Sequence, residues 1–257
     1  MNIELENNSA PTLEKFFNDR EDIQGVMFDV DNTLVVTDKY FSDITYYLGM
    51  DIAEQIEISK YIEVIAQELG NKIGEIYRRN KYHPILMDEL CKEALKEYLS
   101  IENVSEDIQS VLDYWLKDFY LESPALNEGT VPLLKEIRRC QRKIGLHSHA
   151  QDEWTRIKAD VISERLGESI PYFFTDISLN KDKDRWIQSC EIIDTPIENV
   201  LVVGDNLYAD IFPAIEAGCK HLIWINRHDI KIPEETTIPG NVELMIVNRL
   251  EEILYSL

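Results

Sequence analysis

The sequence predicts a doubly wound α/β fold, in which a mostly parallel β-sheet is interrupted by one all-helical insertion. Short apolar runs alternate with segments of helical period along most of the chain. One long stretch, from about Asp38 to Ser123, departs from this alternation and shows helical patterns only. Alternation of strands and helices at this spacing is typical of βαβ units and a parallel sheet.

The apolar runs that we expect to form strands are short and well separated. In chain order they are Val26–Phe28, Lys143–His147, Tyr172–Ile177, Val200–Val203, His221–Ile225 and a weaker run near Leu244–Val247. The helical segments between them are Val131–Arg142, Asp152–Leu166, Arg185–Ile193 and Ile211–Ala217. Gly167 and Gly218 directly follow two of these segments, and glycine is common just past the last turn of a helix.

The helical insertion lies directly after the first strand. Its apolar residues recur at spacings of three and four, which indicates amphipathic helices packed on each other. They are Ile58, Ile62, Ile65, Leu69, Ile73 and Ile76, and then Ile108, Leu112, Trp115 and Phe119. We therefore predict a core formed by residues 1–37 and 124–257 and a helical cap formed by residues 38–123. Within the polar leader, PTLEKFFNDR predicts a short helix packed outside the sheet.

The composition disfavours several classes of protein. The 257 residues are 44% hydrophobic and carry a net charge of −22, which opposes binding to nucleic acids and to anionic membranes. No apolar run is long enough for a membrane-spanning helix, and the polar, acidic N-terminus fits neither a signal nor a transit peptide, so we expect a cytoplasmic protein. The four cysteines (Cys91, Cys140, Cys190 and Cys219) are far apart, which indicates reduced packing residues rather than disulfides or zinc ligands.

Acidic residues follow two of the predicted strands. In GVMFDVDNTLV, Asp29 and Asp31 interrupt an apolar run, where mutual repulsion and lost solvation should raise at least one pKa. Asp205 follows the fourth run, and Ser148 ends the second. Ligands bind at the carboxyl ends of the strands in such sheets, so we expect the three acids to converge there. A hard cation would offset their repulsion, and Mg²⁺ suits a site that it shares with a phosphate.

Asp210 is expected to cap a helix that begins at Ile211, with Pro213 in its first turn, where the missing N–H costs little. Each acid taken alone is equally well explained as a helix cap or loop residue. Their joint position at strand ends is what favours a site.

These residues resemble the four motifs of the haloacid dehalogenase-like (HAD) hydrolase superfamily. The motifs are DVDNT, a serine that ends the second strand, a lysine ahead of a helix, and GDNLYAD, and they occur in the superfamily's order. The helical insertion resembles the C1 cap of the phosphoglycolate phosphatase-like branch. The resemblance runs from about Gln24 to Asn226 and weakens inside the cap.

The resemblance implies roles for the acids. Asp29 would attack phosphorus and form an aspartyl-phosphate, and Asp31 would protonate the leaving alcohol and then activate water. Mg²⁺ would be bound by Asp29, by the backbone carbonyl of Asp31 and by Asp205. Asp210 would not bind the metal itself but would help to orient these ligands.

The resemblance also implies a phosphate-binding group. Ser148 and the amide of His149 would bind the phosphoryl oxygens, and Thr33 would help to fix the first loop. Asn32 stands where the superfamily often has glycine, and asparagine tolerates turn geometry. His149 stands where asparagine or glycine is common, and we interpret it either as a loop histidine with a satisfied hydrogen bond or as a group that tunes pH dependence.

The choice of the catalytic lysine stays open between Lys181 and Lys183. Both precede a helix in SLNKDKDRWIQS, where the superfamily's usual Lys-Pro pair is absent. Aligning Trp186 with the superfamily's aromatic residue favours Lys181 as the partner of Asp29 and phosphate.

A basic cluster lies in the predicted cap. Arg78, Arg79 and Lys81 stand together in YRRNKYHP. They either complement a helix dipole or recognise a second acidic group on a substrate.

Other functions remain alternatives. A 2-haloacid dehalogenase needs neither a second acid nor a metal, so Asp31 and Asp205 count against it. A phosphomutase of the same superfamily is chemically possible, and a non-catalytic HAD-fold binding protein would be expected to have lost an acid. A response-regulator receiver has no place for the insertion, and no GxGxxG motif indicates dinucleotide binding.

The sequence therefore predicts a Mg²⁺-dependent phosphatase that hydrolyses a small phosphomonoester through an aspartyl-phosphate intermediate. The expected partner is a small phosphorylated metabolite. The cap would close over the site and set the choice of substrate.

Overall fold

The computed structural model describes residues 13–55, 62–80, 83–100, 104–117 and 119–256. Its centre is a six-stranded sheet in the order β3-β2-β1-β4-β5-β6, and all neighbouring strands are parallel. The strands are β1 Gly25–Asp29, β2 Lys143–His149, β3 Tyr172–Thr175, β4 Val200–Gly204, β5 His221–Ile225 and β6 Glu243–Val247. The predicted fold class is confirmed, and the weak sixth run forms a strand at one edge.

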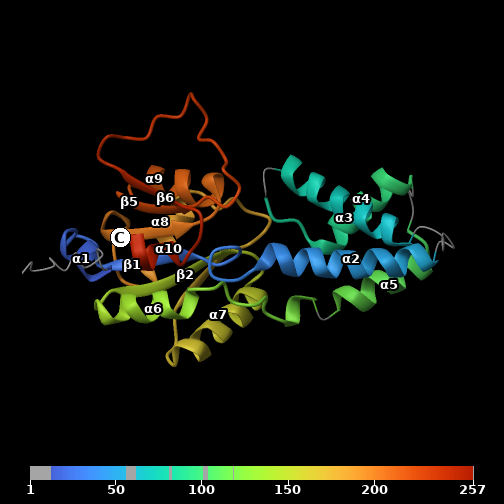
Figure 1. The fold of residues 1–257 in the computed structure, drawn as a ribbon, viewed down its shortest axis with the longest axis horizontal. Helices are drawn as coiled ribbons and strands as arrows, with labels where there is room; N and C mark the ends of the chain where they lie inside the picture. The colour runs from blue at the N-terminus through green and yellow to red at the C-terminus, as the bar shows by residue number, and fades with distance from the viewer. Residues whose placement is uncertain (1–12, 56–61, 81–82, 101–103, 118, 257) are drawn as a thin grey trace, which may run out of the picture.

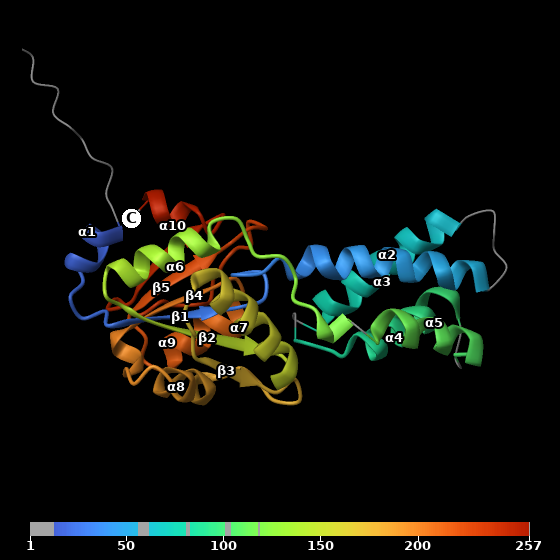
Figure 2. The same ribbon diagram turned by 90° about the horizontal axis from the view of Figure 1, so that it is seen from below.

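Helices cover both faces of the sheet (Figure 1 and Figure 2). One face carries α1 Leu13–Asn18, α6 Thr130–Arg139, α7 Asp152–Leu166 and α10 Glu252–Ser256, and the other carries α8 Lys183–Glu191 and α9 Phe212–Glu216. Short turns precede β4 (η2, Ile197–Asn199) and α9 (η3, Leu207–Ile211, a π-helical turn). Alternate residues of the central strands face these two layers, so Val26 and Phe28 pack on one side and Met27 on the other.

All the described helices and turns between β1 and α6 belong to one helical segment of the chain. They are α2 Thr37–Gln55, α3 Ile62–Arg79, α4 Met87–Leu99, α5 Glu106–Leu116 and the 3₁₀ turn η1 Phe119–Leu121. We call residues 37–121 the helical insertion. Its core contains Leu69, Ile73 and Leu112 from the predicted stripes, whereas Ile58 lies outside the described residues. The insertion lies beyond the end of the sheet that is opposite to α1 (Figure 2).

Several element ends differ from the sequence prediction. The helix predicted to reach Arg142 ends at Arg139, because Gln141 adopts a positive φ of 58° and its N–H returns to the carbonyl of Arg138. The strand predicted to reach Ile177 ends at Thr175, because Asp176 accepts hydrogen bonds from Ser178 and turns the chain.

The direction of the chain connections reverses between β1 and β4. The connections to β2 and β3 place α6 and α7 on one face, whereas the connections to β4 and β5 place α8 and α9 on the other. The carboxyl ends of β1 and β4 therefore form the topological switch point, which is where ligands bind in doubly wound sheets.

Two expectations from composition concern the chain as a whole. The four cysteines are free, and three of them are buried. Among the described residues, no helix combines the length and the apolar character needed to cross a membrane.

Candidate active site

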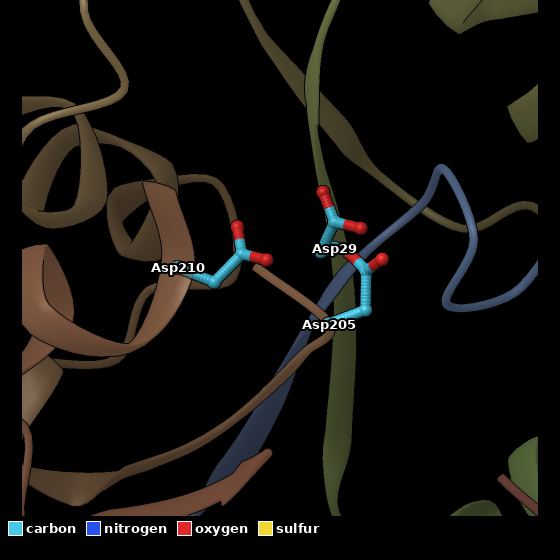
Figure 3. Close-up of side chains that lie close together, drawn as sticks. All are labelled: Asp29, Asp205 and Asp210. Atoms are coloured by element: carbon cyan, nitrogen blue, oxygen red, sulfur yellow. The ribbon is translucent and has the colours of Figure 1, made fainter. Parts of the chain in front are cut away.

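Three carboxylates meet at the switch point. Asp29 is the last residue of β1, Asp205 follows β4, and Asp210 belongs to η3. One oxygen from each lies within 4.8 Å of the others, and Figure 3 shows the side chains pointing toward one another. Of the three acids expected to converge, Asp29 and Asp205 do so, whereas the side chain of Asp31 is not part of the group and Asp210 is its third member.

Asp29 and Asp205 form the part of this group that is suited to a cation. The Oδ2 atom of Asp29 is buried and has no hydrogen-bond partner. Burial, and then the charge of Asp210, raise the pKa of Asp29 to about 7. Burial, and then the charge of Asp29, raise the pKa of Asp205 well above its ordinary value. A hard divalent cation such as Mg²⁺ would relieve both penalties, because it binds carboxylate oxygens and stabilises their ionised form.

Asp210 has a different part in the arrangement, since both of its oxygens already have partners. Its Oδ1 accepts a hydrogen bond from Lys181 at 2.7 Å, and its Oδ2 accepts one from the amide of Asn206 at 2.9 Å. The residue therefore holds the loop after β4 against the lysine. Gly204 makes this packing possible, because a Cβ atom there would lie 2.5 Å from Oδ2 of Asp210.

The prediction that Asp210 caps a helix beginning at Ile211 is wrong. Asn206 is the capping residue, and its Oδ1 accepts from the amides of Tyr208 and Ala209. Asp210 lies inside the π-helical turn that follows, which directs its buried side chain at Lys181. Pro213 lies in the first turn of α9, as expected.

Lys181 is the lysine that reaches the acids. Its ammonium group lies 2.7 Å from both Asp29 Oδ1 and Asp210 Oδ1 and donates to the carbonyl of His147 at 2.9 Å. Burial lowers the pKa of Lys181, but the charges of Asp210 and Asp29 outweigh this effect. The pKa of Lys181 therefore lies above its ordinary value, and the group stays charged. Lys183 is the first residue of α8 and is exposed.

Asp31 is not part of this group of three acids, and hydrogen-bond donors hold its carboxylate. Thr37 Oγ1 is 2.7 Å from its Oδ1, Ser148 Oγ is 2.8 Å from its Oδ2, and Lys158 Nζ lies 2.8 and 2.6 Å from the two oxygens. Burial raises the pKa of Asp31, but the charge of Lys158 and the hydrogen bonds outweigh it and lower this pKa below its ordinary value. The surroundings of the two acids of DVDNT thus act in opposite directions, because they raise the pKa of Asp29 and lower that of Asp31.

The residues predicted to bind phosphate surround the same edge. Ser148 lies in β2 with its hydroxyl on Asp31, and the buried hydroxyl of Thr33 has no partner. Asn32 adopts a positive φ of 57° and exchanges hydrogen bonds with Asp38, so it makes the turn expected of it. His149 Nε2 lies 2.8 Å from the carbonyl of Leu179, and burial followed by the charge of Lys181 lowers the pKa of His149 to about 4.

Comparison with known proteins now places this site in a family. The model of the haloacid dehalogenase-like hydrolase family matches residues 23–218, which include Asp29, Ser148, Lys181 and Asp205. The chain belongs to this family of hydrolases. A search of curated proteins finds no significant match.

Solved structures with the same fold include hydrolases of several kinds. One is the HAD-hydrolase YfnB from Bacillus subtilis bound to magnesium, with 17% identity, 90% of this chain and 96% of that chain covered, and a TM-score of 0.60. A HAD phosphatase from Thermococcus onnurineus has 16% identity, the same coverage and a TM-score of 0.57. A dehalogenase with an intermediate complex has 17% identity, again the same coverage and a TM-score of 0.58. At these identities the likeness concerns the fold.

The helical insertion of this HAD-like hydrolase reaches the acids. Burial, and then the charges of Asp31 and Asp205, raise the pKa of Tyr77 on α3. The ring of His83, in the loop before α4, meets the ring of His149 edge to face with centroids 5.0 Å apart. Two side chains of the insertion thus border the site.

One residue of the predicted basic cluster, Arg79, pairs with acids of the insertion itself. Arg79 forms ion pairs with Glu93 and Glu97 on α4, at 2.6 and 2.7 Å. Arg78 is exposed, and Lys81 lies outside the described residues. The ion pairs favour the interpretation of Arg79 as a structural residue of the insertion.

Sequence reasoning missed three residues of this site. Lys158 and Thr37 hold Asp31, and Asn206 orders the loop that carries Asp205 and Asp210. Thr37 and Asn206 stand next to the recognised motifs, and an asparagine ahead of a helix is a common cap. Lys158 lies 127 residues from Asp31 in sequence, so only its place on an otherwise apolar helix face marks it.

We expect Mg²⁺ to raise the melting temperature of the metal-free protein. A ligand that binds only the folded state at about 100 times its Kd stabilises it by about 2.7 kcal/mol, which corresponds to roughly 5–10 °C for a chain of this size. Asp205→Asn should remove most of this shift. Asp43→Asn, which changes an exposed acid paired with Lys39, should keep it. An undiminished shift in Asp205→Asn would exclude Asp205 as a metal ligand.

We also expect Asp29 to make the metal-free protein less stable as pH rises. Its folded pKa of about 7 lies above the ordinary 3.8, so the fold favours the neutral acid. The resulting stability is complete below about pH 4 and is lost as pH rises through about 7. Asn is neutral at every pH, so Asp29→Asn in chelator should gain in unfolding free energy relative to wild type between pH 5 and 8. Urea unfolding at these two pH values measures the difference, and an unchanged difference would contradict a raised pKa.

Proposed function

We propose that this HAD-like hydrolase is a Mg²⁺-dependent phosphatase that hydrolyses a small phosphomonoester through an aspartyl-phosphate on Asp29. The observation that carries the proposal is the second carboxylate, Asp31, which Thr37, Ser148 and Lys158 hold beside the nucleophile position. An alcohol leaving from phosphorus needs a proton, whereas a halide leaves without one. A positioned second acid therefore favours phosphate-ester chemistry over dehalogenation.

In the first half of the reaction, a carboxylate oxygen of Asp29 attacks phosphorus and the bond to the leaving alcohol breaks. Lys181 keeps one oxygen of Asp29 in place at 2.7 Å and supplies positive charge next to the transferring group. Mg²⁺, held by Asp29, Asp205 and the backbone carbonyl of Asp31, would keep Asp29 ionised and offset the charge of the phosphate. Ser148 and the amide of His149 bind the phosphoryl oxygens, and Asp31 delivers the proton to the alcohol.

In the second half, Asp31 takes a proton from water, and the water oxygen attacks phosphorus to release phosphate and restore Asp29. The lowered pKa of Asp31 favours its carboxylate form, which is the form that a base requires. Asp29 thus carries the phosphoryl group and Asp31 carries the proton. Two acids whose surroundings shift their pKa values in opposite directions are suited to two such different roles.

The substrate would lie between the strand ends and the insertion. Tyr77 and His83 border this space and are the candidates to contact the part of the substrate that is not phosphate. Closure of the insertion over the site would exclude water during transfer to Asp29.

Hydrolysis of a panel of substrates tests the proposal. The panel contains para-nitrophenyl phosphate, alkyl and sugar phosphates and 2-chloropropionate, each assayed with Mg²⁺ and with excess chelator. The proposal expects release of phosphate from at least one ester, its loss in chelator, and no release of chloride. Chloride release, or phosphate release that chelator does not affect, would contradict it.

A further inference from the structure

Lys158 is a buried lysine that the family motifs leave without a role. It lies in the second turn of α7, on the apolar side that also carries Trp154 and Ile162, and it is 0% exposed. Burying an ammonium group is costly unless it is paired. Its partner is Asp31, whose two oxygens lie 2.8 and 2.6 Å from Nζ.

The ammonium group is covered on its other sides. Ser148 Oγ lies 3.4 Å from Nζ, and the ring of Trp154 stacks beneath it with its centroid at 3.8 Å. Asp31 retains an exposed fraction of 24% in its side chain, whereas that of Lys158 has none. A substrate therefore meets Asp31 rather than Lys158, so the lysine acts through the acid.

Trp154 joins this pair to the ends of the insertion. Its ring packs against Phe41 near the start of α2 and against Phe119 and Tyr120 in η1, and its Nε1 donates to the carbonyl of Glu122 at 2.9 Å. Both ends of the insertion thus contact Trp154, whose ring lies against the ammonium group. Thr37, the other residue that fixes Asp31 Oδ1, is the first residue of α2.

We infer that Lys158 is a positioning residue that keeps Asp31 oriented toward the leaving group of the substrate. The inference rests on the proposed function. A cation held by Asp29 and Asp205 would attract the nearby Asp31 carboxylate, which would then be a third metal ligand rather than a proton carrier. Lys158 offers a competing positive charge on the opposite side, with both oxygens engaged.

This role has a kinetic consequence that a structural or phosphate-binding role does not share. Nitrophenolate leaves with little need for a proton, whereas an alkoxide must be protonated as it leaves. Loss of the orientation of Asp31 should therefore slow transfer of the phosphoryl group to Asp29 much more for alkyl phosphates than for para-nitrophenyl phosphate.

The test compares wild type, Lys158→Met and Lys158→Arg on para-nitrophenyl phosphate and on an alkyl phosphate that the wild type hydrolyses. We expect kcat/KM of Lys158→Met to fall about 10²-fold more with the alkyl ester than with the aryl ester. This constant reports phosphoryl transfer to Asp29 and not the later hydrolysis of the aspartyl-phosphate, which both esters share. Lys158→Arg should recover part of the loss, and inhibition by inorganic phosphate should be unchanged. An equal loss on both esters, no loss, or weakened inhibition by phosphate would overturn the inference.

A second comparison covers the case in which Lys158→Met does not fold because it leaves Asp31 unpaired. In Asp31→Asn/Lys158→Met no buried charge lacks a partner. If Lys158 acts through Asp31, this double variant should match Asp31→Asn on both esters, and a large further loss would overturn the inference. A wild type that hydrolyses no phosphate ester would instead contradict the proposed function.

Discussion

Asp29→Asn is expected to lower kcat for phosphate-ester hydrolysis by about 10⁴-fold or more. Removal of a covalent nucleophile eliminates the two-step route, and only positioning and charge stabilisation remain. The substitution changes little else, because asparagine has the size of aspartate and Lys181 keeps its contacts with Asp210 and the carbonyl of His147. Initial rates with saturating Mg²⁺ measure the effect.

The control for this variant is Asp43→Asn. Asp43 lies in α2, and among the interactions described it pairs only with Lys39. Exposed pairs of this kind contribute little to stability, so its activity should equal that of the wild type. A melting curve of Asp29→Asn separates a chemical defect from misfolding. Activity of Asp29→Asn above about one hundredth of the wild type, in a folded protein free of wild-type contamination, would contradict the nucleophile assignment.

Lys181→Met is expected to have the second large effect, on both activity and stability. The ammonium group satisfies Asp29 and Asp210 at once, and its removal leaves two buried carboxylates facing each other. Removing one partner of a buried ion pair typically costs about 3–5 kcal/mol. We expect a loss of this size in the unfolding free energy without metal, and a fall in kcat of about 10³-fold or more with Mg²⁺.

Lys183→Met is the matched control, since it removes the same charge two residues away from an exposed position. It should retain wild-type activity and stability. The opposite result, with Lys183→Met inactive and Lys181→Met active, would mean that the site in solution uses the other lysine of SLNKDKDRWIQS.

Much of the fold and of the acidic site follows from local patterns. β1 and β4 are apolar runs that end at acids, and a parallel sheet brings their carboxyl ends together without any knowledge of the helices. The resemblance favoured Lys181 over Lys183, because Trp186 on α8 aligns with the superfamily's aromatic residue on this helix. In the structure its ring centroid lies 4.9 Å from Lys181 Nζ.

The rest depends on contacts that local patterns do not contain. Lys158 and Asp31 come from segments separated by the whole insertion, and only the packing of α7 on the sheet brings them together. A signal was nevertheless present, because Lys158 interrupts the stripe Trp154, Thr155, Ala159 and Ile162 on the buried face of α7. A lysine at a core position of an amphipathic helix needs an acid partner.

The error at Asp210 has a similar origin. Asn206 and Asp210 are both good helix caps, and sequence alone does not tell which of them begins the helix. The π-helical turn Leu207–Ile211 starts the helical segment earlier than predicted. Asp210 then faces the core, where Lys181 and the close approach to Gly204 determine its position.

The central claim is that a phosphoryl group is transferred to Asp29, and trapping it tests this claim most directly. Wild type turning over a substrate identified in the panel would be quenched in acid, digested and analysed by peptide mass spectrometry, with Asp29→Asn treated in parallel. The account predicts that the wild-type peptide Gly25–Val35 gains the mass of one phosphoryl group and that the variant peptide does not. A phosphoryl group on another residue, or an unmodified peptide when pre-steady-state kinetics show that an intermediate accumulates, would contradict it.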